Sequence, residues 1–395
     1  MMSPFNDLHF QITRREAVMK RILVLETGGT IACTVRQEEG KAPVYEAREV
    51  LQRFVPQAYK LADLTLDAPI RDERGRGVCI DSTNMTYKNT AQIAGRIYRG
   101  YTEGVEGVVV LGGTDTMEDT GADLTFYLPN KKIPVVLTGS MRPPDHPESD
   151  APANLLNAVR FATYGMPGTY IVFRGRVISA ARAKKINPTN IDAFRSINFP
   201  AIGRMVDGEF IPNQEALEPF ERYRARTADR KMELRNSFRE LSHVQTHYRN
   251  IRPSLLDRFF EDSYRAIIFE APGTGGIPNH PPWKSFIPVI QKWGPRRLIG
   301  ITSKAFSGQA TGEYEVSAAA FKAGATSLYD MLTQTAVSKS TWLFGQIGAK
   351  ERDMGKIKML MLYPFEMEIS EDRVPGEKRL TREQMEELLY PDSLS

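Results

Sequence analysis

The sequence predicts an α/β protein with a larger amino-terminal domain, built on a mostly parallel sheet, and a smaller carboxyl-terminal α/β domain. Three observations lead to this expectation. The chain has 395 residues, more than one hydrophobic core usually serves, and 41% of them are hydrophobic. Short aliphatic runs alternate with segments of helical periodicity, as in a parallel sheet covered by helices. A charged stretch separates two sets of such units.

The first set of units begins at residue 21 and alternates regularly between strand-like and helical segments. The expected strands are 21–26, a short segment before residue 81, 108–111, 134–141 and 169–177. The expected helices are 47–53, 89–100, 118–128 and 152–162. Because buried parallel strands are apolar on both faces, these uninterrupted aliphatic runs favour a sheet with helices on both sides.

The second set of units begins near residue 265 and is shorter. Strands are expected near 265–271 and 296–303 and at 356–365, with a helix over 315–325. Thr381 and Gln384 have the spacing of a capping box, so a final helix should begin there.

The segment between the two sets is rich in charge and poor in large apolar residues, which favours a linker or insertion. The expected organisation is therefore a disordered extension at 1–18, an amino-terminal domain at 19–213, a charged linker at 214–262 and a carboxyl-terminal domain at 263–395. The basic surplus within 221–239 fits either an ion-paired helix face or a docking surface for an acidic partner.

Composition argues against several classes of protein. The net charge of +4, on 25% charged residues of both signs, gives no reason to expect nucleic acid or an anionic membrane as partner. Two cysteines suit a reducing, cytoplasmic setting rather than a disulfide framework. His243 and His247 lack the intervening Glu of a zinc-protease helix, and no glycine motif for nucleotides occurs, so no metal or cofactor is expected.

Two strand ends carry residues of the types that take part in catalysis. The strand at 21–26 runs into two glycines and Thr30, and the strand at 108–111 runs into Gly112, Gly113, Thr114 and Asp115. In open α/β sheets the active site lies at such carboxyl ends, although a lone Thr-Asp pair can equally be a helix cap. A threonine hydroxyl is a weak nucleophile and needs a base. Lys185 in a polar loop is the candidate, and it would have to lose its proton to act as that base.

These motifs together resemble the bacterial-type L-asparaginase/glutaminase family, in matching order from about residue 21 to residue 350. The matching segments are LETGGTIA (25–32), GGTDTMEDT (112–120), VVLTGSMRP (135–143), SDAPANLLNAV (149–159), KINPTNIDAFRS (185–196), GITSKA (300–305) and GEYEVSAAAFKAGA (312–325).

The resemblance implies roles for five catalytic residues. Thr30 matches the nucleophile that attacks a side-chain amide and forms an acyl-enzyme, with release of ammonia. Tyr45 matches the tyrosine of a loop that closes over the substrate. Thr114, Asp115 and Lys185 match the second catalytic group, in which the threonine activates a nucleophile under the influence of the lysine.

The resemblance also implies how substrate binds. Asp115 matches the residue that holds the α-amino group, and Ser82 matches the residue that binds the α-carboxylate, with Thr83 beside it. Ser140 lies in the loop near the amide. Relatives form homodimers or homotetramers in which the small domain of one subunit completes the site of its neighbour.

Four residues depart from the family pattern, one of them Ser140, which stands where the family usually has alanine. Gly112 stands where most relatives have histidine, Thr83 where many have glutamine or an acidic residue, and Gly276 where some have asparagine. The last two changes touch substrate recognition and leave the preferred amide open.

The leading expectation is hydrolysis of L-asparagine to L-aspartate and ammonia. Alternatives are a glutaminase-type amidase, the ammonia-generating subunit of a glutamyl-tRNA amidotransferase, and a non-catalytic scaffold. The 142–155 loop looks like the amidotransferase branch, but only about 20 residues precede the first strand, fewer than its additional amino-terminal barrel needs.

Overall fold

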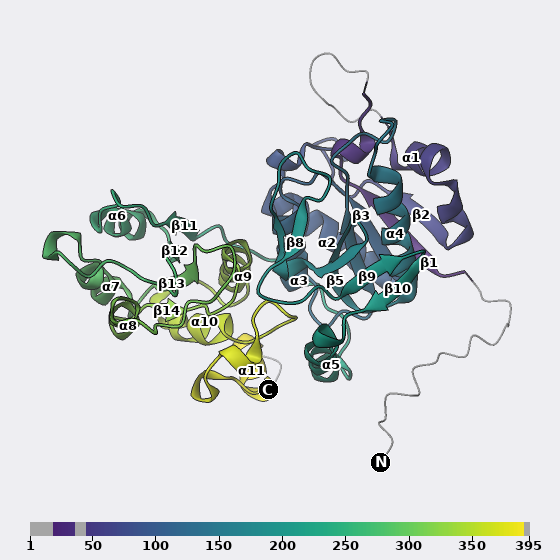
Figure 1. The fold of residues 1–395 in the computed structure, drawn as a ribbon. Coiled ribbons are helices and arrows are strands. Elements are labelled where there is room, and N and C mark those ends of the chain that lie inside the picture. The colour runs from purple at the N-terminus through teal and green to yellow at the C-terminus, as the bar shows by residue number, and fades with distance from the viewer. Residues whose placement is uncertain (1–18, 36–44, 391–395) are drawn as a thin grey trace.

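The computed structural model describes residues 19–35 and 45–390, which form two α/β domains lying side by side (Figure 1). The expected fold class is confirmed: a large domain with a parallel-rich sheet is followed by a smaller domain with a parallel sheet. The proposed extension at 1–18 lies outside the described residues. No helix in the described part of the chain is long and apolar enough to cross a membrane.

The large sheet has eight strands in the order β10-β9-β6-β5-β4-β3-β1-β2. The five strands from β5 to β2 are parallel, whereas β6, β9 and β10 run antiparallel at the other side. The strands are β1 (Arg21–Glu26), β2 (Asp63–Asp67), β3 (Gly107–Leu111), β4 (Pro134–Thr138), β5 (Gly168–Phe173), β6 (Arg176–Ser179), β9 (Gly203–Val206) and β10 (Glu209–Pro212).

One expected strand is a hairpin. The sequence predicts a continuous strand over 169–177, but Arg174 and Gly175 both adopt positive φ angles, 50° and 73°, and reverse the chain between β5 and β6. Two consecutive left-handed residues are the conformation of a tight hairpin turn. The apolar residues on both sides conceal this turn in the sequence.

Helices cover both faces of the large sheet. They are α1 (Ala47–Phe54), α2 (Tyr87–Thr102), α3 (Met117–Tyr127) and α4 (Ala151–Tyr164). Alternate residues of β1 point to opposite faces, so that Leu23 joins one core cluster with Ile97 of α2, and Val24 joins another with Leu155 of α4. This two-sided burial is why the strands read as uninterrupted apolar runs.

The small domain has a parallel sheet in the order β11-β12-β13-β14. Its strands are β11 (Ser242–Thr246), β12 (Ala266–Ala271), β13 (Leu298–Ser303) and β14 (Thr326–Ser327), and its helices are α6 (Ser254–Asp262), α7 (Ile287–Trp293), α8 (Glu315–Lys322), α9 (Thr333–Gln346) and α10 (Met354–Met361). Helix α9 packs on α3 of the large domain, where Trp342 stacks on Phe126 at a centroid distance of 5.7 Å.

The expected strand at 356–365 is wrong: residues up to Met361 form α10. Met354, Ile357 and Met361 are buried at helical spacing, which is hidden in the sequence because the lysines between them also alternate as in a strand. Short apolar runs of this kind fit either period, so tertiary packing decides between them.

The charged segment 214–262 is folded. It begins with α5 (Gln214–Thr227) and ends with β11 and α6, and β11 pairs in register with β12. His243 therefore lies on a strand rather than on a helix face. Between α5 and β11 an extended stretch bridges the domains, because Arg235 donates its N–H to Tyr127 of α3 and accepts from Trp342 of α9.

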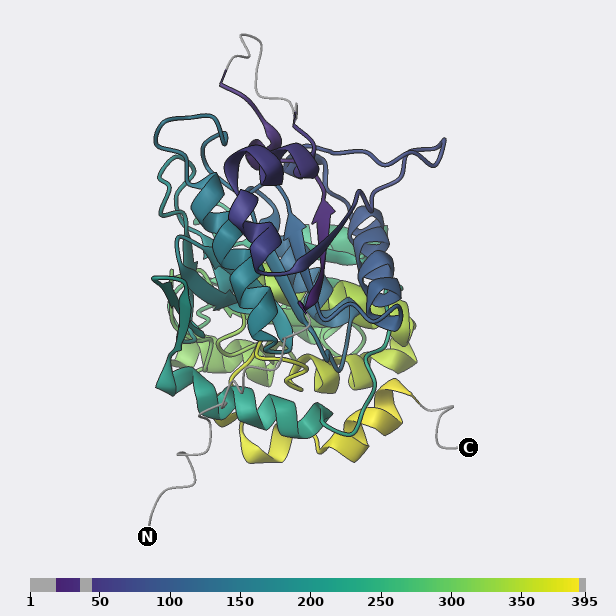
Figure 2. The same ribbon diagram turned by 90° about the vertical axis from the view of Figure 1, so that its right-hand side faces the viewer.

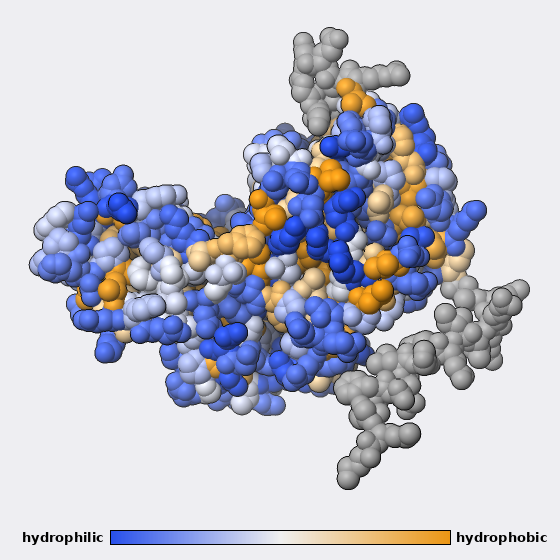
Figure 3. All heavy atoms as spheres, viewed as in Figure 1, coloured by the Kyte–Doolittle hydropathy of each residue, from blue (hydrophilic) through white to orange (hydrophobic). Residues whose placement is uncertain are grey.

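The basic surplus of this segment is largely paired within the molecule. Figure 2 shows α5 and the carboxyl-terminal arm, residues 363–390, along the same edge of the molecule. Arg222 and Arg226 of α5 both bind Glu371 of the arm, and Arg230 binds Glu386 in α11 (Arg382–Leu389). These contacts support the ion-paired reading over a docking surface. The face in Figure 3 is accordingly mostly hydrophilic around the lower edge.

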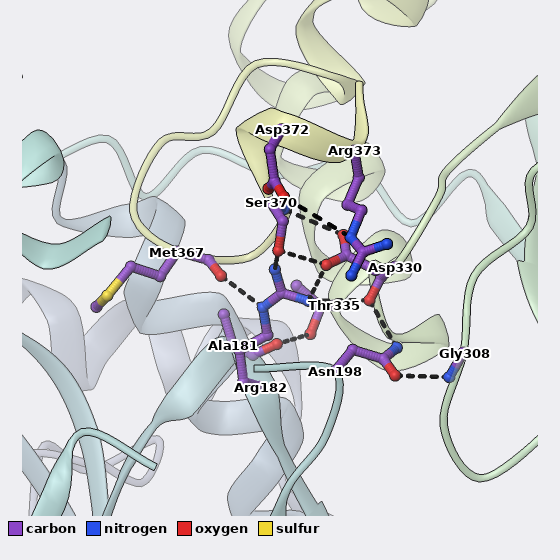
Figure 4. A network of polar contacts seen from close by, with 10 residues as sticks. All are labelled: Ala181, Arg182, Asn198, Gly308, Asp330, Thr335, Met367, Ser370, Asp372 and Arg373. Carbon is purple, nitrogen blue, oxygen red and sulfur yellow. Dashed lines mark hydrogen bonds and ion pairs between the residues drawn. The ribbon is translucent and has the colours of Figure 1, made fainter. Parts of the chain in front are cut away.

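The arm is tied to both domains by buried polar contacts (Figure 4). Arg182, fully buried, donates to the carbonyl oxygens of Met367 and Asp330 and to the Ser370 hydroxyl. Two buried ion pairs reinforce this junction, Lys131–Glu366 at 2.9 Å and Lys339–Glu368 at 2.7 Å. The expected capping box of Thr381 and Gln384 is confirmed at the start of α11.

Candidate active site

Three turns meet at the carboxyl edge of the large sheet. Strands β1, β3 and β4 are parallel neighbours, with Glu26 opposite Leu111 and Leu111 opposite Thr138, so the turns that follow them leave the sheet side by side. The carboxyl edge of a parallel sheet is where α/β proteins place ligands. Thr30, Thr114 and Ser140 all lie in these turns.

Glycines allow the turns to touch through their backbones. A Cβ on Gly29, whose φ is +86°, would lie 2.3 Å from the backbone nitrogen of Gly113, and a Cβ on Gly139 would lie 2.3 Å from the carbonyl oxygen of Gly112. Only glycine fits such approaches. Since Thr30 and Thr114 directly follow Gly29 and Gly113, this contact brings the two threonines to one place.

Thr30 begins a short 3₁₀ turn, Thr30–Ala32, and is half-buried. Its carbonyl oxygen accepts a hydrogen bond from Cys33, which fixes the backbone directly after the glycines. A hydroxyl held on a rigid strand end, with no side chains on the preceding two residues, is accessible to a reacting carbonyl.

Thr114, Asp115 and Lys185 form a connected group. The Lys185 ammonium donates to the Thr114 hydroxyl at 2.7 Å and to the Asp115 carboxylate at 2.6 Å. The lysine side chain is 12% exposed and that of Asp115 is 63% exposed, so the lysine is enclosed while the carboxylate faces solvent. The Thr114 hydroxyl also lies 3.5 Å from the Met141 sulfur. This group can polarise a nucleophile while presenting a negative charge outward.

Lys185 reaches the site from a separate ribbon. It ends β7 (Ala183–Lys185), which pairs only with β8 (Phe194–Ser196) among the described strands. The backbone N–H of Lys185 donates to Glu118 in the first turn of α3, and the neighbouring Lys184 ammonium binds the other oxygen of Glu118 at 2.6 Å. Sequence reasoning missed Glu118, whose only signal was its place within the GGTDTMEDT segment that carries Thr114.

Ser82 joins the site and Thr83 lies beside it. Ser82 is 5% exposed, its carbonyl oxygen accepts the Thr116 hydroxyl at 2.7 Å, and a Cβ on Gly113 would lie 2.5 Å from its Oγ. Thr83 is exposed, and its backbone N–H donates to the Asp81 carboxylate at 2.8 Å. Ser82 is therefore built into the wall of the site, whereas Thr83 is at its rim.

Ser140 has unused hydrogen-bonding capacity. The residue is 1% exposed, and its hydroxyl has no hydrogen-bond partner among the described residues. The turn that carries it is held by Asp150, which accepts the backbone N–H groups of Met141 and Arg142 at 3.0 to 3.1 Å. A buried hydroxyl without a protein partner keeps its capacity to hydrogen-bond a bound molecule.

The Tyr45 side chain contacts residues outside the threonine turns. Its hydroxyl donates to Asp145 at 3.4 Å and its ring packs against Phe54 at 5.8 Å. Asp145 also accepts the Thr34 hydroxyl at 2.5 Å and the Val35 N–H. Burial acts to raise the pKa of Asp145, but these hydrogen bonds outweigh it and hold the pKa below its usual value. Asp145 thus forms hydrogen bonds with Thr34 and Val35, which precede residues 36–44, and with Tyr45, which follows them.

Within residues 19–35 and 45–390, no group of three or more His, Cys, Asp or Glu side chains is arranged to hold a metal ion.

Comparison with known protein families agrees with this architecture. Residues 21–217 match the family described as Asparaginase, N-terminal, and residues 243–361 match the Glutaminase/Asparaginase C-terminal domain. The two matches define a two-domain amidohydrolase. The chain belongs to the asparaginase/glutaminase family.

Individual relatives fall into two groups. An L-asparaginase from Thermococcus kodakarensis is 30% identical over 86% of this chain and 96% of its own length. The D subunit of the glutamyl-tRNA(Gln) amidotransferase from Pyrococcus abyssi is 29% identical over 92% of this chain and 80% of its own length. The solved structure of the thermostable L-asparaginase from Thermococcus kodakarensis superimposes with a TM-score of 0.76 at 28% identity, covering 89% of this chain and 99% of that one.

Proposed function

We propose that the protein hydrolyses the side-chain amide of L-asparagine to L-aspartate and ammonia, with Thr30 as nucleophile. The observation that carries this proposal is the contact of the largely enclosed Lys185 ammonium with Thr114 at 2.7 Å, directly beside the glycine turn that presents Thr30. The family assignment limits the reaction to an amide hydrolysis, and the site supplies the groups that such a reaction needs.

The reaction divides into acylation and deacylation. The Thr30 oxygen attacks the amide carbon, and its proton passes to the leaving nitrogen as the carbon–nitrogen bond breaks and ammonia departs. The product is an ester between Thr30 and the aspartyl group. Water then attacks the ester carbon, its proton returns to Thr30 as the carbon–oxygen bond breaks, and L-aspartate is released. Thr114, polarised by Lys185, orients and activates the water that attacks the ester.

Substrate recognition uses one carboxylate and several hydroxyl groups near the threonines. The exposed carboxylate of Asp115 is available for an α-amino group, and Ser82 and the rim residue Thr83 for the α-carboxylate. The unpartnered hydroxyl of Ser140 is suited to the amide end. Tyr45 would act as a covering residue only if it left Asp145.

The remaining expectations form part of the same proposal. The active protein is a cytoplasmic homodimer or homotetramer in which a neighbouring small domain completes each site, and no cofactor is required. The domain limits at residues 213, 214–262 and 263 also remain proposals.

Two related functions are separated by experiment. Similarity to the amidotransferase D subunit is the reason to test whether the protein supplies ammonia to a tRNA-dependent reaction. A glutaminase-type amidase would use the same site residues as the proposed asparaginase. Ammonia release should be measured with asparagine, glutamine and small peptidyl amides. The proposal is supported if asparagine gives the highest kcat/KM. If glutamine gives a higher kcat/KM, glutamine takes the place of asparagine as the proposed substrate.

Controls identify the site and exclude a scaffold. Thr30→Ala should abolish release, and Thr114→Ala should abolish continued release beyond the first turnover. Ammonia that appears only with charged tRNA and a partner protein would favour the amidotransferase function. No release under either condition would leave a non-catalytic scaffold.

A further inference from the structure

We propose that Glu118 is the positioning residue that sets the distance between Lys185 and Thr114, an inference that rests on the role proposed for Lys185. Glu118 is 7% exposed and is the fourth residue after Thr114. One of its carboxylate oxygens accepts the backbone N–H of Lys185, and the other accepts the Lys184 ammonium at 2.6 Å.

These contacts close a ring. The chain runs from Thr114 into α3, from Glu118 across to the backbone of Lys185, and along the lysine side chain back to the Thr114 hydroxyl at 2.7 Å. The first part of the ring is helix and turn, and the last part is a side chain that is 12% exposed. Fixing the lysine backbone therefore limits where its ammonium can lie.

The ring matters because the main sheet does not hold β7. This strand has three residues and pairs with the equally short β8 in a separate two-stranded ribbon. Other anchors act upstream of the lysine: Thr335 donates to the carbonyl oxygen of Ala181 at 2.8 Å and Gln334 to that of Ala183 at 3.0 Å (Figure 4 shows the former). Glu118 is the anchor at the lysine itself.

A simpler role for Glu118 is a negative charge at the amino terminus of α3, which stabilises a helix through its dipole. The two roles make opposite demands on the side chain. Positioning needs an acceptor oxygen at the full length of a glutamate, whether or not it is charged. Helix stabilisation needs the charge and tolerates a shorter side chain.

Two substitutions separate these roles. Glu118→Gln keeps the length and one acceptor oxygen but removes the charge, so kcat should fall no more than about fivefold, as expected for the loss of a partly exposed ion pair with Lys184. Glu118→Asp keeps the charge but withdraws the oxygen from Lys185. A displacement of about 1 Å in a catalytic group costs on the order of 10²-fold in rate.

The matched control is Lys184→Met, which removes the other partner of Glu118 and leaves the Lys185 contact in place. Its kcat should also stay within about fivefold of the unmodified protein. A Glu118→Asp variant as active as the unmodified protein, or a Glu118→Gln variant slower than Glu118→Asp, would overturn the proposal.

Hydrogen–deuterium exchange gives a readout that needs no substrate. Glu118→Asp should speed exchange in peptides covering 183–196, whereas Glu118→Gln and Lys184→Met should not. If the unmodified protein released no ammonia from any amide but kept this exchange pattern, the proposed function would fail while the positioning of Lys185 by Glu118 was upheld. Equal exchange in all four proteins would refute the positioning role.

Discussion

Replacing Lys185 by methionine removes an ammonium but keeps most of the buried aliphatic stem. Thr114, 8% exposed, would lose a donor at 2.7 Å, and Asp115, 63% exposed, would lose an ion pair that water can largely replace. The cost in stability should therefore come mainly from Thr114 and amount to about 1–3 kcal/mol. The loss in catalysis should be larger, because positioned acid–base groups contribute about 10²- to 10⁴-fold.

This loss corresponds to roughly 2.7–5.4 kcal/mol in the activation free energy. The assay is ammonia release from asparagine at saturating substrate, with kcat and KM determined separately. The control is Lys184→Met, because that side chain is 44% exposed and its ammonium binds Glu118 rather than Thr114. If Lys185→Met kept more than a tenth of the original kcat, or if Lys184→Met lost as much, the assignment of Lys185 would be refuted.

Three further predictions concern stability. Lys339→Met leaves the fully buried Glu368 carboxylate without its ion-pair partner and should lower the free energy of unfolding, measured in urea, by about 3–5 kcal/mol. Adding Glu368→Gln should recover much of this loss. Equal instability of the single and double variants would contradict the ion-pair account. Burial raises the pKa of Asp123 to about 8, so the folded state holds its proton more tightly and stability should fall as pH rises from about 4 to 8. Asp123→Asn should accordingly raise Tm more at pH 8.5 than at pH 5. Equal changes in Tm at the two pH values would contradict a raised pKa for Asp123. Gly29→Ala should lower both Tm and kcat because its Cβ would meet a facing backbone nitrogen at 2.3 Å; Gly75→Ala, with a similar φ of +75° and open space, should lower Tm less and leave kcat unchanged.

The parts of the site that lie within single motifs could be predicted from sequence. Thr30 and Thr114 each follow a strand and a glycine pair, and the order of strands in a parallel sheet places such turns along one edge. Lys185 is predicted from its chemistry and from the family resemblance, and the structure puts its ammonium on Thr114, 71 residues away in the chain.

Other features depend on contacts that no local pattern encodes. Glu118 reads as an ordinary residue of a helix start, and its carboxylate gains a role only because β7 passes beside α3. Tyr45 is expected to close over the substrate, and its hydroxyl donates to Asp145, in a loop 100 residues further on. The sequence of helix α10 resembles a strand because its apolar residues satisfy both periods.

The central claim is that Thr30 carries the acyl group. The most direct test is acid quenching of the Thr114→Ala variant after it is mixed with asparagine, because this variant should form the ester but not hydrolyse it, followed by peptide mass spectrometry. An aspartyl ester on the peptide that contains Thr30, absent when Thr30→Ala is added, is the predicted result. An ester on another residue, or continued turnover by Thr30→Ala, would contradict the account.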